Sequence, residues 1–348
     1  MNYVFDADTG DDLVEVTDEL TEQWKRHLDT HKRRIDPVER EWDRIKKTLH
    51  EYEYVYSSSY NQKNISSKVP ISRSYFKLKE ILQVFNVSVG PESRVACVAE
   101  APGGFVECVR EMDARVEGIT LRSKDPKVPY WHRKVSEDSK VTIHTGPSND
   151  GDIYKFKNIL TFIKDIGPHS MDVVTGDGGF DNSGDYNHQE GNSFPLIYSE
   201  MYLAMYLQKV GGAFICKLFD TFDARTIRLI ALLRPCYETM SFYKPCLSRV
   251  SNSEKYVVCT GFKGCPTATV NQLTRHFVDH DLQNLVSPHL LKNIQGFNET
   301  YVRQQVASIG RGLSLIKGRC FTKEPSLLQV DCATEWCRTY GIPIKPNV

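Results

Sequence analysis

The chain has 348 residues, 40% of them hydrophobic, and its 44 Lys and Arg residues balance 44 Asp and Glu residues. This length predicts one enzyme-sized domain with extensions, and the balanced charge means that a polyanionic partner must be held by local basic patches. No apolar run approaches the length of a membrane span, and the first sixteen residues lack the pattern of a secretory signal. We therefore expect an intracellular protein without a membrane partner.

Ten cysteines are scattered along the chain, and no CxxC spacing occurs among them. This pattern favours reduced, buried thiols over a zinc site or a disulfide framework. We expect no metal.

Residues 1–65 are rich in charge, and apolar residues recur at loosely helical spacing over 18–52, with a break near Pro37. We predict a helical N-terminal extension here. The polar stretch 57–68 is typical of a linker or loop.

From Ser72 onward, short apolar runs rich in β-branched residues alternate with helical patterns. The predicted strands are 94–100, 116–121, 140–145, 171–177, 213–219 and 255–262, and the predicted helices begin at 104, 156 and 195. Such alternation indicates βαβ units, and hence an α/β core with a mainly parallel sheet covered on both faces. Residues 66–265 form this predicted core. Residues 266–348 return to helical patterns and are predicted to be a helical C-terminal extension.

In an open parallel sheet, ligands bind beyond the carboxyl ends of the strands. One such place is "AEAPGGF", 99–105, where glycines let a backbone approach a ligand and a helix begins. The alternative is a tight strand-to-helix turn, and the spacing is not the GxGxxG of a dinucleotide site. A second place is "NDGDIY", 149–154, whose acidic residues either bind an adenine or a ribose or cap the next helix.

Two further strand ends carry ionisable residues. Asp177 lies in "DVVTGDGGFDNSG", 172–184, where it serves either the turn or the chemistry. Lys217 ends the apolar run "GGAFICKLFD", and a lysine there is uncommon because burying an ammonium is costly, unless it reaches out to solvent. Lys77 and Glu254, taken singly, are typical of surface charges.

Together these stretches resemble the FtsJ/RrmJ-type RNA 2′-O-methyltransferases, and among them the cap-specific mRNA nucleoside-2′-O-methyltransferases that make cap 1. The resemblance runs from about Ser72 to Gly264. It is densest in "GGAFICKLFDTF" and "FYKPCLSRVSNSEKYVVCTGFKG", where a strand-end lysine, KPxxSR and NSExYVVC follow at fixed distances.

The resemblance implies a Rossmann-like methyltransferase core whose last strand is antiparallel, with S-adenosylmethionine as the cofactor. It implies a catalytic tetrad of Lys77, Asp177, Lys217 and Glu254. It also implies cofactor contacts from Ala101, Pro102, Gly103, Gly104, Phe105, Asp152, Ile153 and Asp177, and RNA contacts from Arg249 and Asn252. Arg73, a basic residue beside Lys77, is a further candidate for RNA binding through phosphates. One departure is that Thr120 and Leu121 stand where the family often has an acidic residue for the cofactor ribose.

These residue types suit methyl transfer to a hydroxyl, which is a weak nucleophile that has to be deprotonated or polarised. A lysine acts as a general base only if burial or a neighbouring cation lowers its pKa, and Lys77 is the candidate neighbour for Lys217. Asp177 and Glu254 favour the charged ammonium instead. Lys217 is thus either a base, as the resemblance implies, or a cation that stabilises an alkoxide.

The expected activity is methylation of the ribose 2′-hydroxyl of the first transcribed nucleotide of capped mRNA, cap 0 to cap 1. The alternatives are an rRNA or tRNA ribose methyltransferase and a catalytically silent RNA-binding relative. Basic residues near Tyr130 and Trp131 either stack a methylated guanine or belong to a solvated loop with one packed aromatic residue. The expected partners are the capped mRNA 5′ end and other capping or transcription proteins. The expected location is the nucleus for a cellular protein and the cytoplasm for a viral one.

Overall fold

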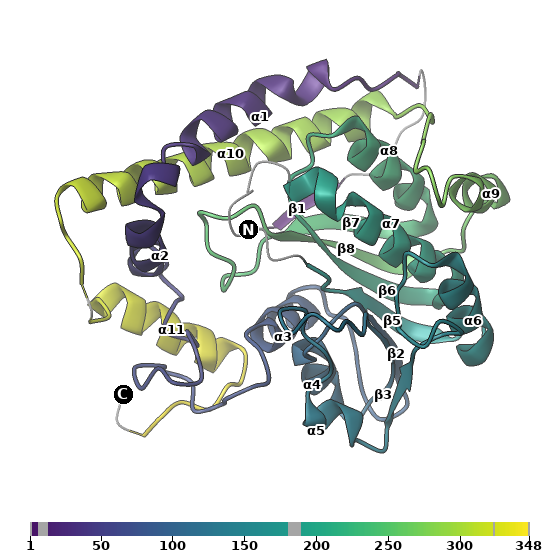
Figure 1. Cartoon of the computed structure of the whole chain (residues 1–348), viewed down its shortest axis with the longest axis horizontal. Helices are drawn as coiled ribbons and strands as arrows, with labels where there is room; N and C mark the ends of the chain where they lie inside the picture. Colours follow the sequence, from purple (N-terminus) through teal and green to yellow (C-terminus); the bar gives the residue numbers. More distant parts are fainter. Residues whose placement is uncertain (1, 6–12, 180–188, 323, 347–348) are drawn as a thin grey trace.

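A computed structural model describes residues 2–5, 13–179, 189–322 and 324–346. Within these residues eight strands form one sheet in the order β1-β7-β8-β6-β5-β2-β3-β4 (Figure 1). The strands are β1 Asn2–Phe5, β2 Arg94–Val98, β3 Arg115–Ile119, β4 Val141–His144, β5 Met171–Gly176, β6 Gln208–Leu218, β7 Tyr237–Tyr243 and β8 Lys255–Phe262.

The sheet is parallel from β4 through β3, β2 and β5 to β6, and β8 then runs antiparallel to β6. This arrangement confirms the predicted α/β class with its antiparallel last strand. Two strands were not predicted. Strand β7 pairs antiparallel with β8, and β1 adds an edge antiparallel to β7, although β1 comes from a segment predicted to be helical.

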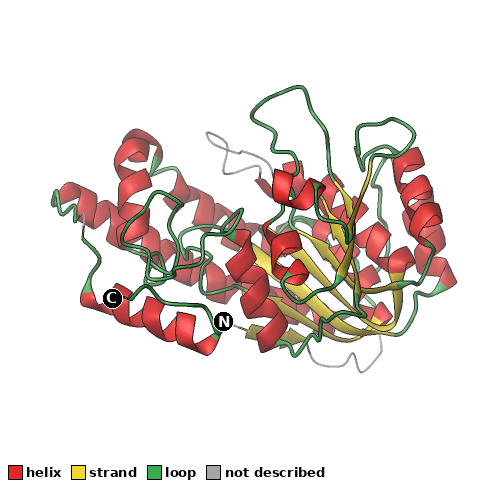
Figure 2. Cartoon of the chain, turned by 90° about the horizontal axis from the view of Figure 1, so that it is seen from below, coloured by secondary structure: helices red, strands yellow, loops and turns green. Residues whose placement is uncertain are grey.

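Alternate residues of each strand face opposite layers of helices, because side chains in a strand point to the two faces in turn. One face carries Cys97, Val173 and Ile215 and packs against α3 Ser74–Val84 and α4 Gly104–Arg110. The other face carries Val98, Val174 and Phe214. It is covered by α6 Phe156–Ile166, α7 Gln189–Leu207 and α8 Ala224–Leu233, so helices lie on both sides of the sheet (Figure 2). The short helices α5 Arg133–Ser136 and η2 Arg234–Cys236 complete the core.

The two ends of the chain pack on each other. Near the N-terminus lie α1 Glu19–Lys32, η1 Asp36–Val38 and α2 Glu39–Thr48, and after the core come α9 Thr267–Arg275, α10 Pro288–Lys317 and α11 Leu327–Thr339. Helix α1 lies along the long helix α10 (Figure 1). A Cβ atom at Gly312 of α10 would lie 2.4 Å from the Trp42 ring of α2, so glycine allows this close approach. The division at residues 65 and 265 remains a proposal.

Helix α11 is tied back to the core. Its N-terminus has a capping box formed by Ser326 and Gln329. The Trp336 indole donates a hydrogen bond of 2.8 Å to Glu80 on α3. The extension that follows the core therefore supports the helix that carries Lys77.

Three further observations concern membrane spans, metal ligands and cysteines. No described helix is both long enough and apolar enough to cross a membrane. Among the described residues, no three potential metal ligands gather into one group. The ten cysteines are free thiols, most of them buried.

Candidate active site

Strand register brings Asp177 and Lys217 together. Gly176 at the end of β5 pairs with Cys216 on β6, and Lys217 pairs with Tyr256 on β8. The Lys217 ammonium donates to the backbone carbonyl of Asp177 at 2.8 Å and lies 3.4 Å from its carboxylate. The Tyr256 hydroxyl donates to the same carboxylate at 2.8 Å. Three strands thus fix Asp177 beside Lys217.

Glu254 and Lys77 form a second pair on the same face of the sheet. Glu254 immediately precedes β8, and its side chain reaches α3. The Lys77 ammonium is 2.7 and 2.8 Å from the two Glu254 carboxylate oxygens, and the Ser248 hydroxyl donates to one of them. The side chains of Lys77 and Glu254 are 13% and 14% exposed, and those of Lys217 and Asp177 are 11% and 13% exposed.

The two pairs interact electrostatically. Burial disfavours the charged form of Glu254, but Lys77 and Lys217 outweigh it and hold the pKa of Glu254 well below its ordinary value. Burial also lowers the pKa of Lys217, yet Asp177, Glu254 and Glu200 together raise it above its ordinary value. Charges therefore alternate from Lys77 to Glu254 to Lys217 to Asp177, and the structure brings together all four predicted tetrad residues. In this arrangement the surrounding carboxylates favour the charged form of Lys217.

Lys244 is a buried residue of the site that the sequence analysis did not single out, although it begins the KPxxSR stretch. Its ammonium donates to the Asn252 carbonyl and side-chain oxygens, both at 2.8 Å, and to the Glu254 carbonyl at 2.6 Å. Burial lowers the pKa of Lys244 to about 7. Lys244 therefore holds the loop that presents Asn252 and Glu254.

We expect Lys244→Met to lower kcat about tenfold or more, because lost hydrogen bonds to a charged group cost about 1.5–3 kcal/mol and the loop would no longer be fixed. In steady-state kinetics, the plot of kcat against pH should also have an inflection near pH 7 in the wild type, where Lys244 titrates, and none in the variant. A variant with an unchanged kcat would contradict this positioning role.

Residues of the turn 99–105 pack closely against neighbouring side chains of the core. Gly103 has a φ of +115°, and a Cβ atom there would lie 2.6 Å from a methyl group of Val135. The Phe105 side chain is fully buried and stacks on the Tyr256 ring, with centroids 6.1 Å apart. Phe105 thus supports the tyrosine that holds Asp177. Cofactor contacts by Ala101, Pro102, Gly103, Gly104 and Phe105 remain a prediction.

The second predicted cofactor segment lies ahead of α6. The Asp152 carboxylate accepts the backbone N–H of Tyr154 at 2.9 Å, and the Ile153 side chain is buried. A Cβ atom at Gly151 would lie 2.1 Å from the Thr120 carbonyl, so this turn packs closely against the end of β3. Asp152 therefore has a local turn role, and its contact with adenine remains a prediction.

The two predicted RNA-binding arginines share one buried partner. Glu53, 1% exposed, accepts two hydrogen bonds from Arg249 at 2.9 and 2.7 Å and lies 3.3 Å from Arg73. Arg73 also donates to the Leu247 carbonyl at 2.9 Å. The guanidinium of Arg73 is therefore enclosed by the protein. Glu53 directly follows the helical pattern 18–52, and the sequence around it gave no indication of this role.

Trp131 is a packed residue. It is 6% exposed, and its ring lies 3.1 Å from the position of a Cβ atom at Gly118 on β3. Trp131 therefore fits the second interpretation of this segment, a solvated loop with one packed aromatic residue. Tyr130 is partly exposed and lies beside the Arg122 guanidinium.

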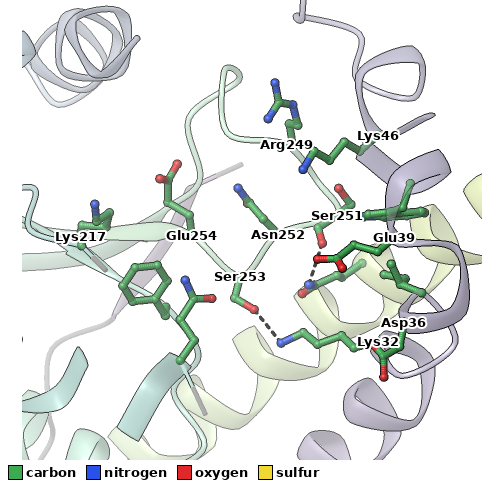
Figure 3. Close-up of a pocket in the computed structure, with 16 residues that line it drawn as sticks. Lys32, Asp36, Glu39, Lys46, Lys217, Arg249, Ser251, Asn252, Ser253 and Glu254 are labelled. Atoms are coloured by element: carbon green, nitrogen blue, oxygen red, sulfur yellow. Dashed lines mark hydrogen bonds between the residues drawn. The ribbon is translucent and has the colours of Figure 1, made fainter. Parts of the chain in front are cut away.

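A cavity of about 470 Å³ opens beside Lys217 and Glu254. Lys217 and Glu254 lie at one end, and Lys46, Glu39 and Asp36 of the N-terminal helices lie at the other (Figure 3). Arg249 and Asn252 line the cavity between these ends. The Lys32 ammonium of α1 bonds to Ser253 and Asp220 at 3.1 Å, so the helical extension is joined to the loop that precedes Glu254. The N-terminal helices thus form one wall of the site.

Comparison with known proteins identifies the family. The model of the FtsJ-like methyltransferase family matches residues 70–262. Cap-specific mRNA (nucleoside-2′-O-)-methyltransferase 1 of Xenopus laevis is 32% identical over 274 residues, which are 73% of this chain and 32% of that protein. The protein of the same name from Trypanosoma brucei brucei is 32% identical over 193 residues, 53% of this chain and 52% of that one.

Among solved structures, a putative ribosomal RNA methyltransferase from Plasmodium falciparum superposes with a TM-score of 0.40 at 18% identity, over 56% of this chain and 98% of that one. The chain spans about a third of the length of its Xenopus relative and half that of its trypanosome relative. The family match covers more than half of the chain and includes Lys77, Asp177, Lys217 and Glu254. The chain belongs to the FtsJ-like methyltransferase family.

Proposed function

We propose that this protein methylates the ribose 2′-hydroxyl of the first transcribed nucleotide of capped mRNA, converting cap 0 to cap 1. S-adenosylmethionine is the methyl donor of the family. The observation that carries the proposal is that the ion pairs Lys77–Glu254 and Lys217–Asp177 interact electrostatically next to the 470 Å³ cavity. The names of the relatives, which specify the mRNA cap, support the choice of substrate.

In this proposal Lys217 is the general base. Its Nζ accepts the proton of the 2′-hydroxyl as the ribose oxygen takes the methyl group. When bound, S-adenosylmethionine supplies this methyl group on a positively charged sulfur, which would keep the electron pair of the broken S–CH3 bond as a neutral thioether. The positive charge before transfer favours a neutral amine nearby. Asp177 holds Lys217 in place, Glu254 acts on Lys217 electrostatically, and Lys77 balances the charge of Glu254. Holding the reacting groups in line contributes several kcal/mol more.

The cavity beside Lys217 is large enough to extend beyond one ribose, and we assign its remainder to the capped end of the RNA. Lys46 and Arg249 supply cations for phosphates, and the carboxylates of Asp36 and Glu39 can accept hydrogen bonds from a guanine edge. Asn252 borders the ribose end. Arg73 contributes indirectly, because it holds Glu53, which also binds Arg249. For a cellular protein this activity places the chain in the nucleus, and for a viral one in the cytoplasm.

The pH dependence of the rate tests Lys217 as a base. The reaction requires the neutral amine, whose fraction increases with pH below the pKa, and the pKa of Lys217 lies above its ordinary value. We therefore expect kcat/KM to rise about tenfold per pH unit between about pH 7.5 and 9.5, above the transition of Lys244. A flat profile over this range would mean that Lys217 acts as a charged stabiliser.

A transfer assay tests the substrate. Purified protein with labelled S-adenosylmethionine is given cap 0 RNA, the same RNA without a cap, and an rRNA fragment. We expect label in cap 0 RNA alone, recovered as a 2′-O-methylated first nucleotide after nuclease digestion. Label in uncapped RNA or rRNA would favour the rRNA or tRNA alternative, and label in none would favour a silent relative.

A further inference from the structure

Glu200 is a buried acid of α7, a helix that covers the sheet on the side opposite to α3. The residue is 1% exposed, and its carboxyl group accepts hydrogen bonds from the backbone N–H of Gly178 at 3.2 Å and from the thiol of Cys216 at 3.1 Å. Gly178 directly follows Asp177, and Cys216 directly precedes Lys217. One carboxyl group thus contacts both chain segments that carry the Asp177–Lys217 pair.

The peptide group between Asp177 and Gly178 is held from both sides. Its carbonyl oxygen accepts a hydrogen bond from the Lys217 ammonium at 2.8 Å, and its N–H donates to Glu200. In a planar trans peptide the C=O and N–H groups point in opposite directions. Glu200 therefore fixes the direction of the carbonyl group that holds the Lys217 ammonium.

The turn after β5 is shaped around the Glu200 carboxyl group. A Cβ atom at Gly176 would lie 2.7 Å from the Glu200 Cδ atom, and one at Gly178 would lie 2.6 Å from the Glu200 Oε1 atom. Both distances are shorter than a Cβ atom tolerates, so the glycines allow the turn to approach the carboxyl group this closely. Gly176 also pairs with Cys216 across β5 and β6. The two strand ends and the carboxyl group therefore pack as one unit.

The contact made by Glu200 does not require a negative charge. Burial raises the pKa of Glu200 to about 8, so the neutral acid prevails at neutral pH. A neutral carboxyl group keeps an oxygen that accepts the Gly178 N–H, and a glutamine amide has an equivalent oxygen. An apolar side chain would fill the same space without the cost of burying a polar group. The acceptor oxygen is thus the feature that distinguishes Glu200 from a packing residue.

We propose that Glu200 is a positioning residue for methyl transfer, which orients the peptide between Asp177 and Gly178 and thereby holds Lys217 at the ribose hydroxyl. Glu200 acts through this peptide from the far side of the sheet. The inference rests on the role of Lys217 in the proposed function, and it does not depend on which RNA is methylated.

Two variants of similar shape separate the contact from the packing. Glu200→Gln keeps an acceptor for the Gly178 N–H, whereas Glu200→Met fills the space without a strong one. At neutral pH we expect Glu200→Gln to have a kcat within about threefold of wild type and Glu200→Met to lose roughly tenfold or more, because Lys217 is misplaced. The KM for RNA should be unchanged in both. Ser199→Ala is the matched control on α7, since its buried hydroxyl bonds to the Pro195 carbonyl of the same helix, and its rate should equal that of wild type.

Hydrogen exchange of the Gly178 amide, followed by mass spectrometry, tests the contact without donor or RNA. We expect roughly tenfold faster exchange in Glu200→Met and wild-type exchange in Glu200→Gln. Unchanged exchange in Glu200→Met would overturn the proposal, and so would an unchanged kcat in that variant or an equal loss of kcat in both variants. A wild type that methylated none of the RNAs would instead refute the proposed function, and the exchange rates would still decide whether Glu200 holds the peptide.

Discussion

The Lys217→Arg variant is expected to methylate RNA at less than a tenth of the wild-type rate, and a loss of roughly 10²-fold or more is the expected size. Arginine stays charged under all assay conditions and is larger than lysine. The Lys217 ammonium is enclosed next to the Asp177 carbonyl, where a guanidinium does not fit without moving the turn. Single-turnover methylation, measured with saturating donor and RNA, reports this loss directly.

The matched control is Lys209→Arg on the same strand. Lys209 pairs with Asp172 at the opposite end of β6 and is half exposed, so its rate should equal that of wild type. Lys209→Arg should also retain the wild-type affinity for S-adenosylhomocysteine. Turnover of Lys217→Arg above a tenth of wild type would contradict a role for Lys217 as base or as stabilising cation.

Glu53→Gln is expected to destabilise the fold by about 3–5 kcal/mol, because it leaves the mostly buried guanidinium groups of Arg73 and Arg249 without their carboxylate partner. The free energy of unfolding from urea titration at neutral pH measures the effect. Since Arg249 belongs to the loop that leads to Asn252 and Glu254, we also expect the KM for RNA to rise.

Glu137→Gln provides the comparison for an exposed ion pair. Glu137 pairs with Arg133 on α5, and both side chains are more than half exposed. Exposed pairs contribute about 0–1 kcal/mol, so this variant should be close to wild type. A Glu53→Gln variant that is as stable as Glu137→Gln would mean that water solvates the two arginines.

Much of the core could be predicted from local pattern. Alternation of apolar runs with helical spacing predicted six of the strands, and the rule that ligands bind at carboxyl ends of parallel strands singled out Asp177 and Lys217. These two residues meet because β5 and β6 are neighbours and end at one edge. Lys77 and Glu254 gave no local indication of their partnership. They were grouped with the other two only through the family resemblance.

Other features depend on contacts that no local pattern records. Strand β1 is four residues long and takes its place only because β7 offers an open edge. Glu53 looks like one more charge in a polar segment, and its importance comes from Arg249, 196 positions later. Lys32 likewise reaches Ser253 across 221 positions. The N-terminal helices form one wall of the cavity because of such tertiary contacts.

The most direct test of the central claim uses two capped RNAs that differ by one oxygen atom. One is a cap 0 RNA, and the other has a 2′-deoxy first nucleotide but is otherwise identical. If Lys77, Asp177, Lys217 and Glu254 form a site for methyl transfer to that hydroxyl, the first RNA accepts one methyl group per molecule and the second accepts none. Equal labelling of the two RNAs would contradict the account.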